Sequence, residues 1–228
     1  MSDRPYVLLS CAMSVDGYID DASPQRLRLS NTADFDRVDS VRASCDAILV
    51  GAGTVRTDDP RLLVRSPERR ARRVARGVPA EPAKVTLTSS GDLDPDAQFF
   101  TTGQAPKLVY AASPAVRELT GRLKGRAEVV DAGDPLILAV ALADLRQRGI
   151  RRLMVEGGGS VHTEFLTLGL ADELQLVVAP FFVGDPYAPR FVQPGVFPQS
   201  PKRQMRLAET TRIGDVVLLR YLIGTGRG

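Results

Sequence analysis

Short apolar runs alternate with amphipathic stretches along the chain, and this alternation constrains the fold more than any other feature. A succession of strand, helix and strand is typical of an α/β sheet with mostly parallel strands. The runs that indicate buried strands lie at residues 6–13, 47–50, 84–88, 107–111 and 152–156. Stretches 173–178 and 204–222 look like consecutive strands, so we expect antiparallel pairing there. We predict one domain, residues 1–228, with helices on both faces of the sheet.

Three segments carry signals for helices. Residues 34–45 have apolar positions at helical spacing, and Asn31 or Thr32 can cap them. Those apolar positions, predicted to share one face, are Phe35, Val38, Val41 and Cys45. Ser113–Pro114 and Asp134–Pro135 each place proline directly after a capping residue, which is a common helix start.

The charge balance is nearly even, with 30 basic and 27 acidic residues and a net charge of +3. Of the basic residues 26 are arginine, and seven of these lie between Arg61 and Arg76. Such a cluster can bind phosphate or nucleic acid. Because residues 65–76 have no interleaved aromatic side chains, we interpret them instead as a solvated surface excursion and expect no nucleic-acid partner.

Cysteine and histidine usage excludes several kinds of site. Cys11 and Cys45 lie in apolar stretches without a Cys-x-x-Cys partner, which argues against a disulfide framework and a zinc site. His162 is the only histidine, so a centre with several histidine ligands is excluded and we expect no metal. No apolar run reaches the roughly 18 residues of a membrane span, and the N-terminus lacks signal-peptide features. We therefore expect a cytoplasmic protein without a membrane partner.

The strongest local signal is residues 153–162, a strand that ends in three glycines opening a helix. Glycines let a phosphate approach the backbone, and the helix start offers unpaired N–H groups to it. The pattern is not the dinucleotide fingerprint G-x-G-x-x-G, and a tight strand-to-helix connection would look the same. Glu156 stands where a parallel strand ends, at the edge where open sheets bind ligands, although it could equally cap a neighbouring helix. His162 on the following helix is expected to be packed or exposed rather than catalytic.

Two further strand ends carry polar groups. Residues 50–65 run from a strand into glycines and supply Thr54, Asp58 and Arg65, a hydroxyl, a carboxylate and a guanidinium that can bind phosphate. Asp16 and Gly17 at the end of the first strand can form a bend. Taken alone, each segment could be a plain turn.

Taken together, three segments resemble one family. They are Arg4–Leu9 followed by Ser14–Gly17, then Ile48–Leu62, and then Val155–His162. They look like the reductase domain of riboflavin biosynthesis, which forms the C-terminal half of bacterial deaminase-reductases and stands alone in archaea and fungi. No deaminase zinc signature precedes them, so we expect a separate reductase. The resemblance covers nearly the whole chain and implies a dihydrofolate-reductase-like three-layer fold, NADPH as cofactor and a homodimer.

The resemblance also implies the reaction and the residues of the site. The reaction delivers a hydride to the ribosyl carbon of a ribosylaminopyrimidine 5′-phosphate and gives the ribitylamino product. The substrate is that of a 5-amino-6-(5-phosphoribosylamino)uracil reductase or of its 2,5-diamino counterpart. Residues implied for NADPH are Ala12, Thr54, Ser89, Gly157, Gly158, Gly159, Ser160 and Val161. Residues implied for the substrate are Asp58, Leu62, Arg65 and Glu156. We expect Arg65 to bind the phosphate, and Asp58 and Glu156 are the catalytic candidates, with Asp58 or a held water as proton donor.

The chain departs from the bacterial pattern on the substrate side. Ser10 stands where those members usually carry a lysine, and residues 26–31 replace their usual substrate loop. We count Ser10, Arg28 and Ser30 among the substrate-binding candidates and expect Arg28 to make the contact of the missing lysine. Three functions stay open: this reductase, a reductase of the same fold recruited to another heterocyclic or pterin-like substrate, and an arginine-rich nucleic-acid binder.

Overall fold

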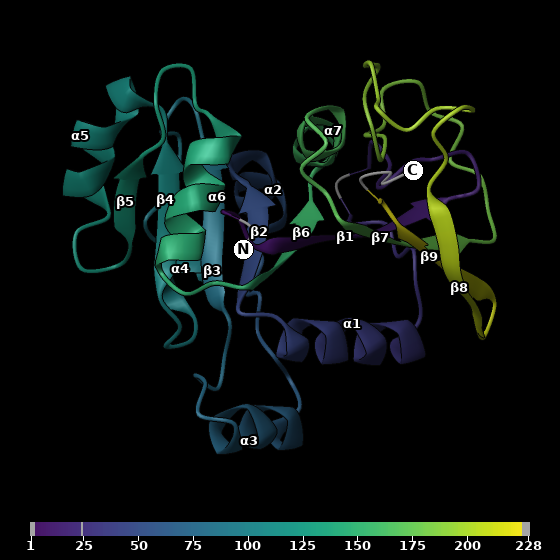
Figure 1. Cartoon of the computed structure of the whole chain (residues 1–228), viewed down its shortest axis with the longest axis horizontal. Coiled ribbons are helices and arrows are strands. Elements are labelled where there is room, and N and C mark those ends of the chain that lie inside the picture. The colour runs from purple at the N-terminus through teal and green to yellow at the C-terminus, as the bar shows by residue number, and fades with distance from the viewer. Residues whose placement is uncertain (1–2, 24, 225–228) are drawn as a thin grey trace. The chain divides into compact units, whose positions relative to one another are not determined.

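The computed structural model describes residues 3–23 and 25–224 (Figure 1). Residues 1–2 and 225–228, the ends of the expected domain, lie outside that part. The chain divides into two compact units. The first consists of Asp39–Met154 with the N-terminal residues up to Tyr6, and the second of Val7–Val38 with Val155–Gly228. This division does not test whether residues 1–228 form a single domain, so that expectation stays a prediction.

The first unit carries a parallel sheet. Its strands are β2 (Ala47–Gly51), β3 (Ala83–Thr88), β4 (Lys107–Ala111) and β5 (Glu128–Asp131). The order is β5-β4-β3-β2-β6, and β3 pairs in parallel with both β2 and β4. The helices are α2 (Ala52–Asp58), α3 (Pro67–Ala75), α4 (Gln98–Thr101), α5 (Ser113–Arg122) and α6 (Leu138–Gln147). Three elements begin in one unit and end in the other. They are β1 (Tyr6–Ser14), α1 (Thr32–Ser44) and β6 (Arg152–Gly157).

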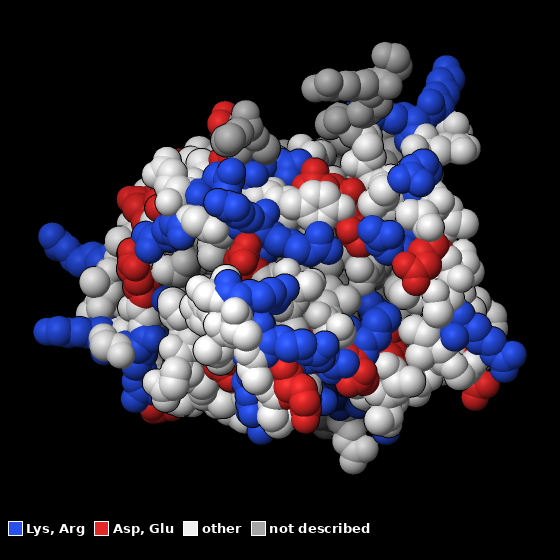
Figure 2. Space-filling model, turned by 60° about the horizontal axis from the view of Figure 1, so that its bottom comes forward, with Lys and Arg blue, Asp and Glu red and all other residues white. Residues whose placement is uncertain are grey.

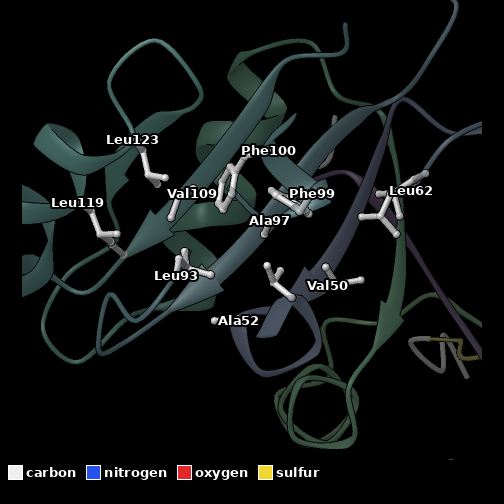
Figure 3. Close-up of a cluster of buried hydrophobic side chains, with 13 residues drawn as sticks. Val50, Ala52, Leu62, Leu93, Ala97, Phe99, Phe100, Val109, Leu119 and Leu123 are labelled. Atoms are coloured by element: carbon white, nitrogen blue, oxygen red, sulfur yellow. The ribbon is translucent and has the colours of Figure 1, made fainter. Parts of the chain in front are cut away.

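A cluster of apolar side chains fills part of the core of this unit. Figure 3 shows it, with Phe99 and Phe100 among Val50, Leu62 and Leu93. The two phenylalanine rings meet edge to face, with 4.9 Å between their centroids. Burial of large apolar side chains of this kind stabilises a fold by roughly 1.5–3 kcal/mol each. The cluster includes side chains from the segments that follow β2 and β3, so it supports the loops at those strand ends.

The second unit ends in an antiparallel ribbon. It contains β1 (Tyr6–Ser14), β7 (Glu173–Ala179), β8 (Arg206–Ile213), β9 (Val216–Leu222) and α7 (Gly159–Thr167). The order is β6-β1-β7-β9-β8, in which β1 and β7 are parallel whereas β7–β9 and β9–β8 are antiparallel. The predicted α/β class, with mostly parallel strands and antiparallel C-terminal strands, is therefore confirmed.

The apolar face predicted for α1 is buried only in part. Val38 and Val41 are half-buried, and Cys45, directly after the helix, is fully buried. Phe35 is 39% exposed, and the residues that α1 buries include Asp34 and Asp39, at 2% and 5% exposure. Each carboxylate has its own partners: Asp34 accepts from Arg37 and Ser30, and Asp39 accepts from Arg69. A buried carboxylate is tolerated when it is hydrogen-bonded in this way. Apolar spacing alone could not reveal that this helix turns acidic groups inward.

Two other expectations need correction. The helix expected at Asp134–Pro135 begins only at Leu138, because residues 134–136 form a turn. The arginine-rich excursion is helical over Pro67–Ala75, where the Ser66 side chain accepts from the N–H of Arg69. It is not wholly solvated, since Arg73 is 2% exposed and donates to the carbonyl oxygens of Ala43, Cys45 and Pro79.

Figure 2 turns forward the side where α3 lies in Figure 1, and acidic side chains are interspersed there among the basic ones. Mixed charge of this kind is common on solvated faces and differs from the single-sign patch that nucleic acid favours. Within the described residues, no helix is long and apolar enough to cross a membrane. The same residues hold no cluster of three or more His, Cys, Asp or Glu side chains that could bind a metal.

Candidate active site

The glycine turn joins β6 to α7 as the sequence predicts. Gly157 has φ of +130°, a region that side chains rarely adopt, and a Cβ on Gly159 would collide with the carbonyl oxygen of Arg190. Gly158 is the N-cap of α7, and no side chain caps it. Ser160 is exposed and Val161 half-buried. The backbone N–H groups of this first turn therefore lack a side-chain acceptor, and the helix dipole favours an anion there.

A loop between β7 and β8 braces this turn. Phe191 contacts the His162 ring, with centroids 5.3 Å apart, and Thr163 accepts from the N–H of Gln193. His162 itself is fully buried, and neither ring nitrogen has a hydrogen-bond partner among the described residues. Burial lowers the pKa of His162 to about 4, so the imidazole is neutral at pH 7. The sequence left open whether His162 is packed or exposed, and the structure shows it packed.

The bend after β1 is held by Asp16. Its carboxylate accepts hydrogen bonds from the Ser14 hydroxyl and from the N–H groups of Val183 and Gly184. Burial acts to raise the pKa of Asp16, but these hydrogen bonds outweigh it and lower the pKa. Arg190 stacks on Tyr18, with its guanidinium carbon 4.3 Å from the ring centroid. The predicted turn therefore also fixes the loop that braces α7.

Within the first unit, α2 carries two of the candidate residues. Thr54 and Asp58 are four positions apart, which places them on one face of the helix. Both are half-buried, and Asp58 accepts from the Thr57 hydroxyl at 2.9 Å. The sequence showed only glycines after this strand, and the helix itself was not predicted.

The loop after α2 is held in an unusual conformation. Leu62 is 3% exposed, packs in the apolar cluster and has φ of +48°. Positive φ is costly for leucine, so the surrounding contacts must maintain it. Arg42 donates to the carbonyl oxygen of Leu63 at 3.1 Å. The buried side chain of Leu62 fixes the position of the residue, so a ligand could contact only its backbone.

Arg65 is positioned through its backbone. Its N–H donates to Asp39, which also accepts from the N–H of Ser66 at 3.3 Å and from Arg69 at 2.9 Å. The Arg65 side chain is exposed and makes no hydrogen bond or ion pair with the residues that the structure describes. Its guanidinium therefore keeps all its donors, as a phosphate ligand would require. Sequence reasoning missed this contact, because Asp39 looks like a solvated residue of a charged helix.

The candidate hydroxyls at the end of β3 differ in availability. Thr88 is buried and accepts from the N–H of Gly91, and Ser90 accepts from that of Asp92. Ser89 is exposed, and its hydroxyl has no partner among the residues described. Thr88 and Ser90 keep their O–H donors, but Ser89 is the exposed hydroxyl that no backbone N–H engages.

Among the substrate candidates of the second unit, Ser10 lies inside strand β1, whereas Arg28 and Ser30 lie in the loop before α1. Ser10 is 6% exposed on β1, where Ala12 packs against Val177 and its neighbours. Arg28 is exposed, donates to the carbonyl oxygen of Ser30 at 3.1 Å and lies over the Phe35 ring. Arg28 is thus engaged at the start of α1. The Ser30 hydroxyl donates to Asp34 at 2.6 Å.

The candidates divide between the two units. Thr54, Asp58, Leu62, Arg65 and Ser89 belong to the first, and Ser10, Ala12, Arg28, Ser30, Glu156 and Gly157–Val161 to the second. Each group lies at strand ends and the loops that follow, with Ser10 and Ala12 inside β1. That all of them serve one site stays a prediction. Burial raises the pKa of the Cys45 thiol, and it raises the pKa of Cys11 to about 12, so both thiols are protonated at pH 7.

Comparison with known proteins identifies the family. Residues 5–219 match the RibD C-terminal domain. The 2,5-diamino-6-ribosylamino-4(3H)-pyrimidinone 5′-phosphate reductase of Archaeoglobus fulgidus is 36% identical over 213 residues, covering 93% of this chain and 95% of the relative. The protein of the same name from Methanothermobacter thermautotrophicus is 34% identical, with coverage of 96% and 99%.

A solved structure agrees in fold. Acinetobacter baumannii RibD superposes with a TM-score of 0.79 at 24% identity, over 98% of this chain and 59% of that protein. This chain therefore spans little more than half of the RibD protein but nearly the full length of the archaeal reductases. The dihydrofolate-reductase-like fold expected from the three motifs is confirmed, and the chain belongs to the RibD C-terminal domain family.

Proposed function

We propose that this protein is an NADPH-dependent reductase of 2,5-diamino-6-ribosylamino-4(3H)-pyrimidinone 5′-phosphate in riboflavin biosynthesis. The observation that carries the proposal is the match, over nearly the whole length of both chains, to two archaeal proteins named as reductases of this compound. The undeaminated pyrimidine is therefore preferred over the deaminated one.

The start of α7 fits a dinucleotide phosphate. It offers backbone N–H groups without a side-chain cap, on a turn whose glycines keep side chains away. Ser89 supports NADPH over NADH, because its unpartnered hydroxyl can donate to a 2′-phosphate. When bound, NADPH supplies the hydride, and the protein has to orient the two ligands and exclude water.

Residues of this chain bind the substrate and supply the proton. Arg65 binds the 5′-phosphate, the backbone at Leu62 contacts the substrate, and Glu156 hydrogen-bonds to it. A proton must reach the ribosyl oxygen or nitrogen as the carbon is reduced. Asp58 is our candidate to hold that proton or the water that delivers it.

The test is an assay of NADPH oxidation with the diamino and the deaminated pyrimidine phosphates in parallel. We expect turnover of the diamino compound. Absence of turnover with both compounds, despite NADPH binding, would favour a reductase recruited to another heterocycle. Equal affinity for NADH and NADPH would contradict the role of Ser89.

A further inference from the structure

Ser10 lies beside Gln175 in the sheet. The two residues are in register on the parallel strands β1 and β7, so their side chains face the same side at neighbouring positions. Both are buried, at 6% and 7% exposure. The Ser10 hydroxyl makes no hydrogen bond with the residues described. Its oxygen is not among the buried side-chain atoms that lack both solvent and a partner, so the hydroxyl is open to a ligand that approaches this end of the sheet.

A chain of hydrogen bonds connects this place to the start of α1. Arg37 on α1 donates through Nη1 to Oε1 of Gln175 at 2.6 Å and through Nε to Asp34 at 2.6 Å. Asp34 accepts in turn from the Ser30 hydroxyl. These hydrogen bonds link residue 30 of the departing loop to Gln175, which is the register neighbour of Ser10 on the adjacent strand.

Arg37 is well placed for recognition. Its side chain is only 18% exposed, so the charge is held in one geometry and partly shielded from water. Asp34 and Gln175 fix the guanidinium through Nε and Nη1, and Nη2 has no acceptor within the part of the chain described. A guanidinium fixed in this way loses little entropy when it binds a further acceptor.

We propose that Arg37 is a substrate-binding residue and that, with Ser10, it takes the place of the lysine found in bacterial members. Nη2 of Arg37 and the Ser10 hydroxyl bind a neutral oxygen acceptor of the pyrimidine substrate. Arg28, engaged at the start of α1, holds the loop rather than the ligand. This inference rests on the proposed function and adds the residue that selects the substrate.

The test compares Arg37→Gln with Arg206→Gln, a matched exposed arginine on β8 of the same unit. We expect Arg37→Gln to raise KM for the pyrimidine substrate about tenfold or more, as for a lost charge-assisted hydrogen bond. The Kd for NADPH should not change. The increase should be the same for the dephosphorylated substrate, because a neutral oxygen is read. Arg206→Gln should behave as wild type.

A second pair of variants tests the exchange with lysine. Ser10→Lys in the wild type places two cations side by side and should impair turnover. In the Arg37→Gln background it should restore at least part of the lost affinity. If Arg37→Gln does not fold because Asp34 loses its partner, the neutral pair Asp34→Asn with Arg37→Gln replaces it in both comparisons.

Two outcomes contradict the role of Arg37 alone, and a third also contradicts the proposed function. A KM for Arg37→Gln equal to that of Arg206→Gln, or a Ser10→Lys effect that is the same in both backgrounds, refutes the role of Arg37 while the wild type still turns over. Absence of turnover by the wild type refutes the proposed function and this inference with it.

Discussion

Arg65 presents a guanidinium that the described protein leaves unengaged, on a backbone fixed by Asp39. We predict that Arg65→Ala weakens transition-state binding of the phosphorylated substrate by ~1.5–3 kcal/mol, the scale of a hydrogen bond to a charged group. Steady-state kinetics with phosphorylated and dephosphorylated substrate measure this, and the loss should shrink with the latter. Arg61→Ala, an exposed arginine of the same loop, is the control. An equal loss with both substrates would show that Arg65 does not bind phosphate.

His162 should make stability depend on pH. Its pKa of about 4 in the folded chain is below the ordinary value of 6.5, so the unfolded chain binds an extra proton between these values. Stability therefore falls as pH decreases from 6.5 toward 4, by at most about 1.4 kcal/mol per pH unit from this group. Urea unfolding at several pH values should show a smaller slope for His162→Gln. Because the chain has one histidine, an unchanged slope would mean that His162 is already protonated or exposed.

The glycine turn at the start of α7 is the element that should set cofactor affinity. Gly158 has φ of −81°, which side chains can adopt, unlike Gly157. Gly158→Val should therefore keep the fold and place a side chain where the pyrophosphate is expected. We expect a large loss of NADPH affinity in a fluorescence titration, with little change in melting temperature. Gly121→Val on α5, where a Cβ meets no neighbour within 4 Å, is the control. Unchanged titration of Gly158→Val would refute the assignment of this turn.

An element can be predicted from sequence when neighbouring residues determine it, and not when it depends on contacts between residues far apart in the chain. The strand ending in glycines at Gly157 was predicted because local residues determine it. The helix α3 was not, although Ser66–Pro67 is the same start signal as Ser113–Pro114, because charge drew the interpretation toward a solvated loop. The contacts of Asp39 and Arg37 could not be predicted, since each side chain meets its partner, Arg69 or Gln175, only in the folded chain.

At the scale of the whole molecule, β8 leaves one edge without a strand partner among the residues described. Its residues are largely exposed, and Leu207 is 50% exposed. Unprotected edges invite pairing, and twofold dimers are the commonest soluble assembly. We predict a homodimer, so light scattering at micromolar concentration should give about twice 24.7 kDa. A mass near 24.7 kDa would contradict it.

The pairing of β1 with β7 has a consequence for how the chain is made. Neighbouring strands of the first unit, from β2 to β5, follow one another in sequence, so they can pair as they leave the ribosome. β1 is translated before all of them, yet β7, its parallel partner, is translated only after the first unit is complete. During that interval Val7, Leu8 and Leu9, all fully buried in the finished protein, have no β7 to pack beside. These apolar residues therefore stay without their β7 neighbour until residue 179 has been translated.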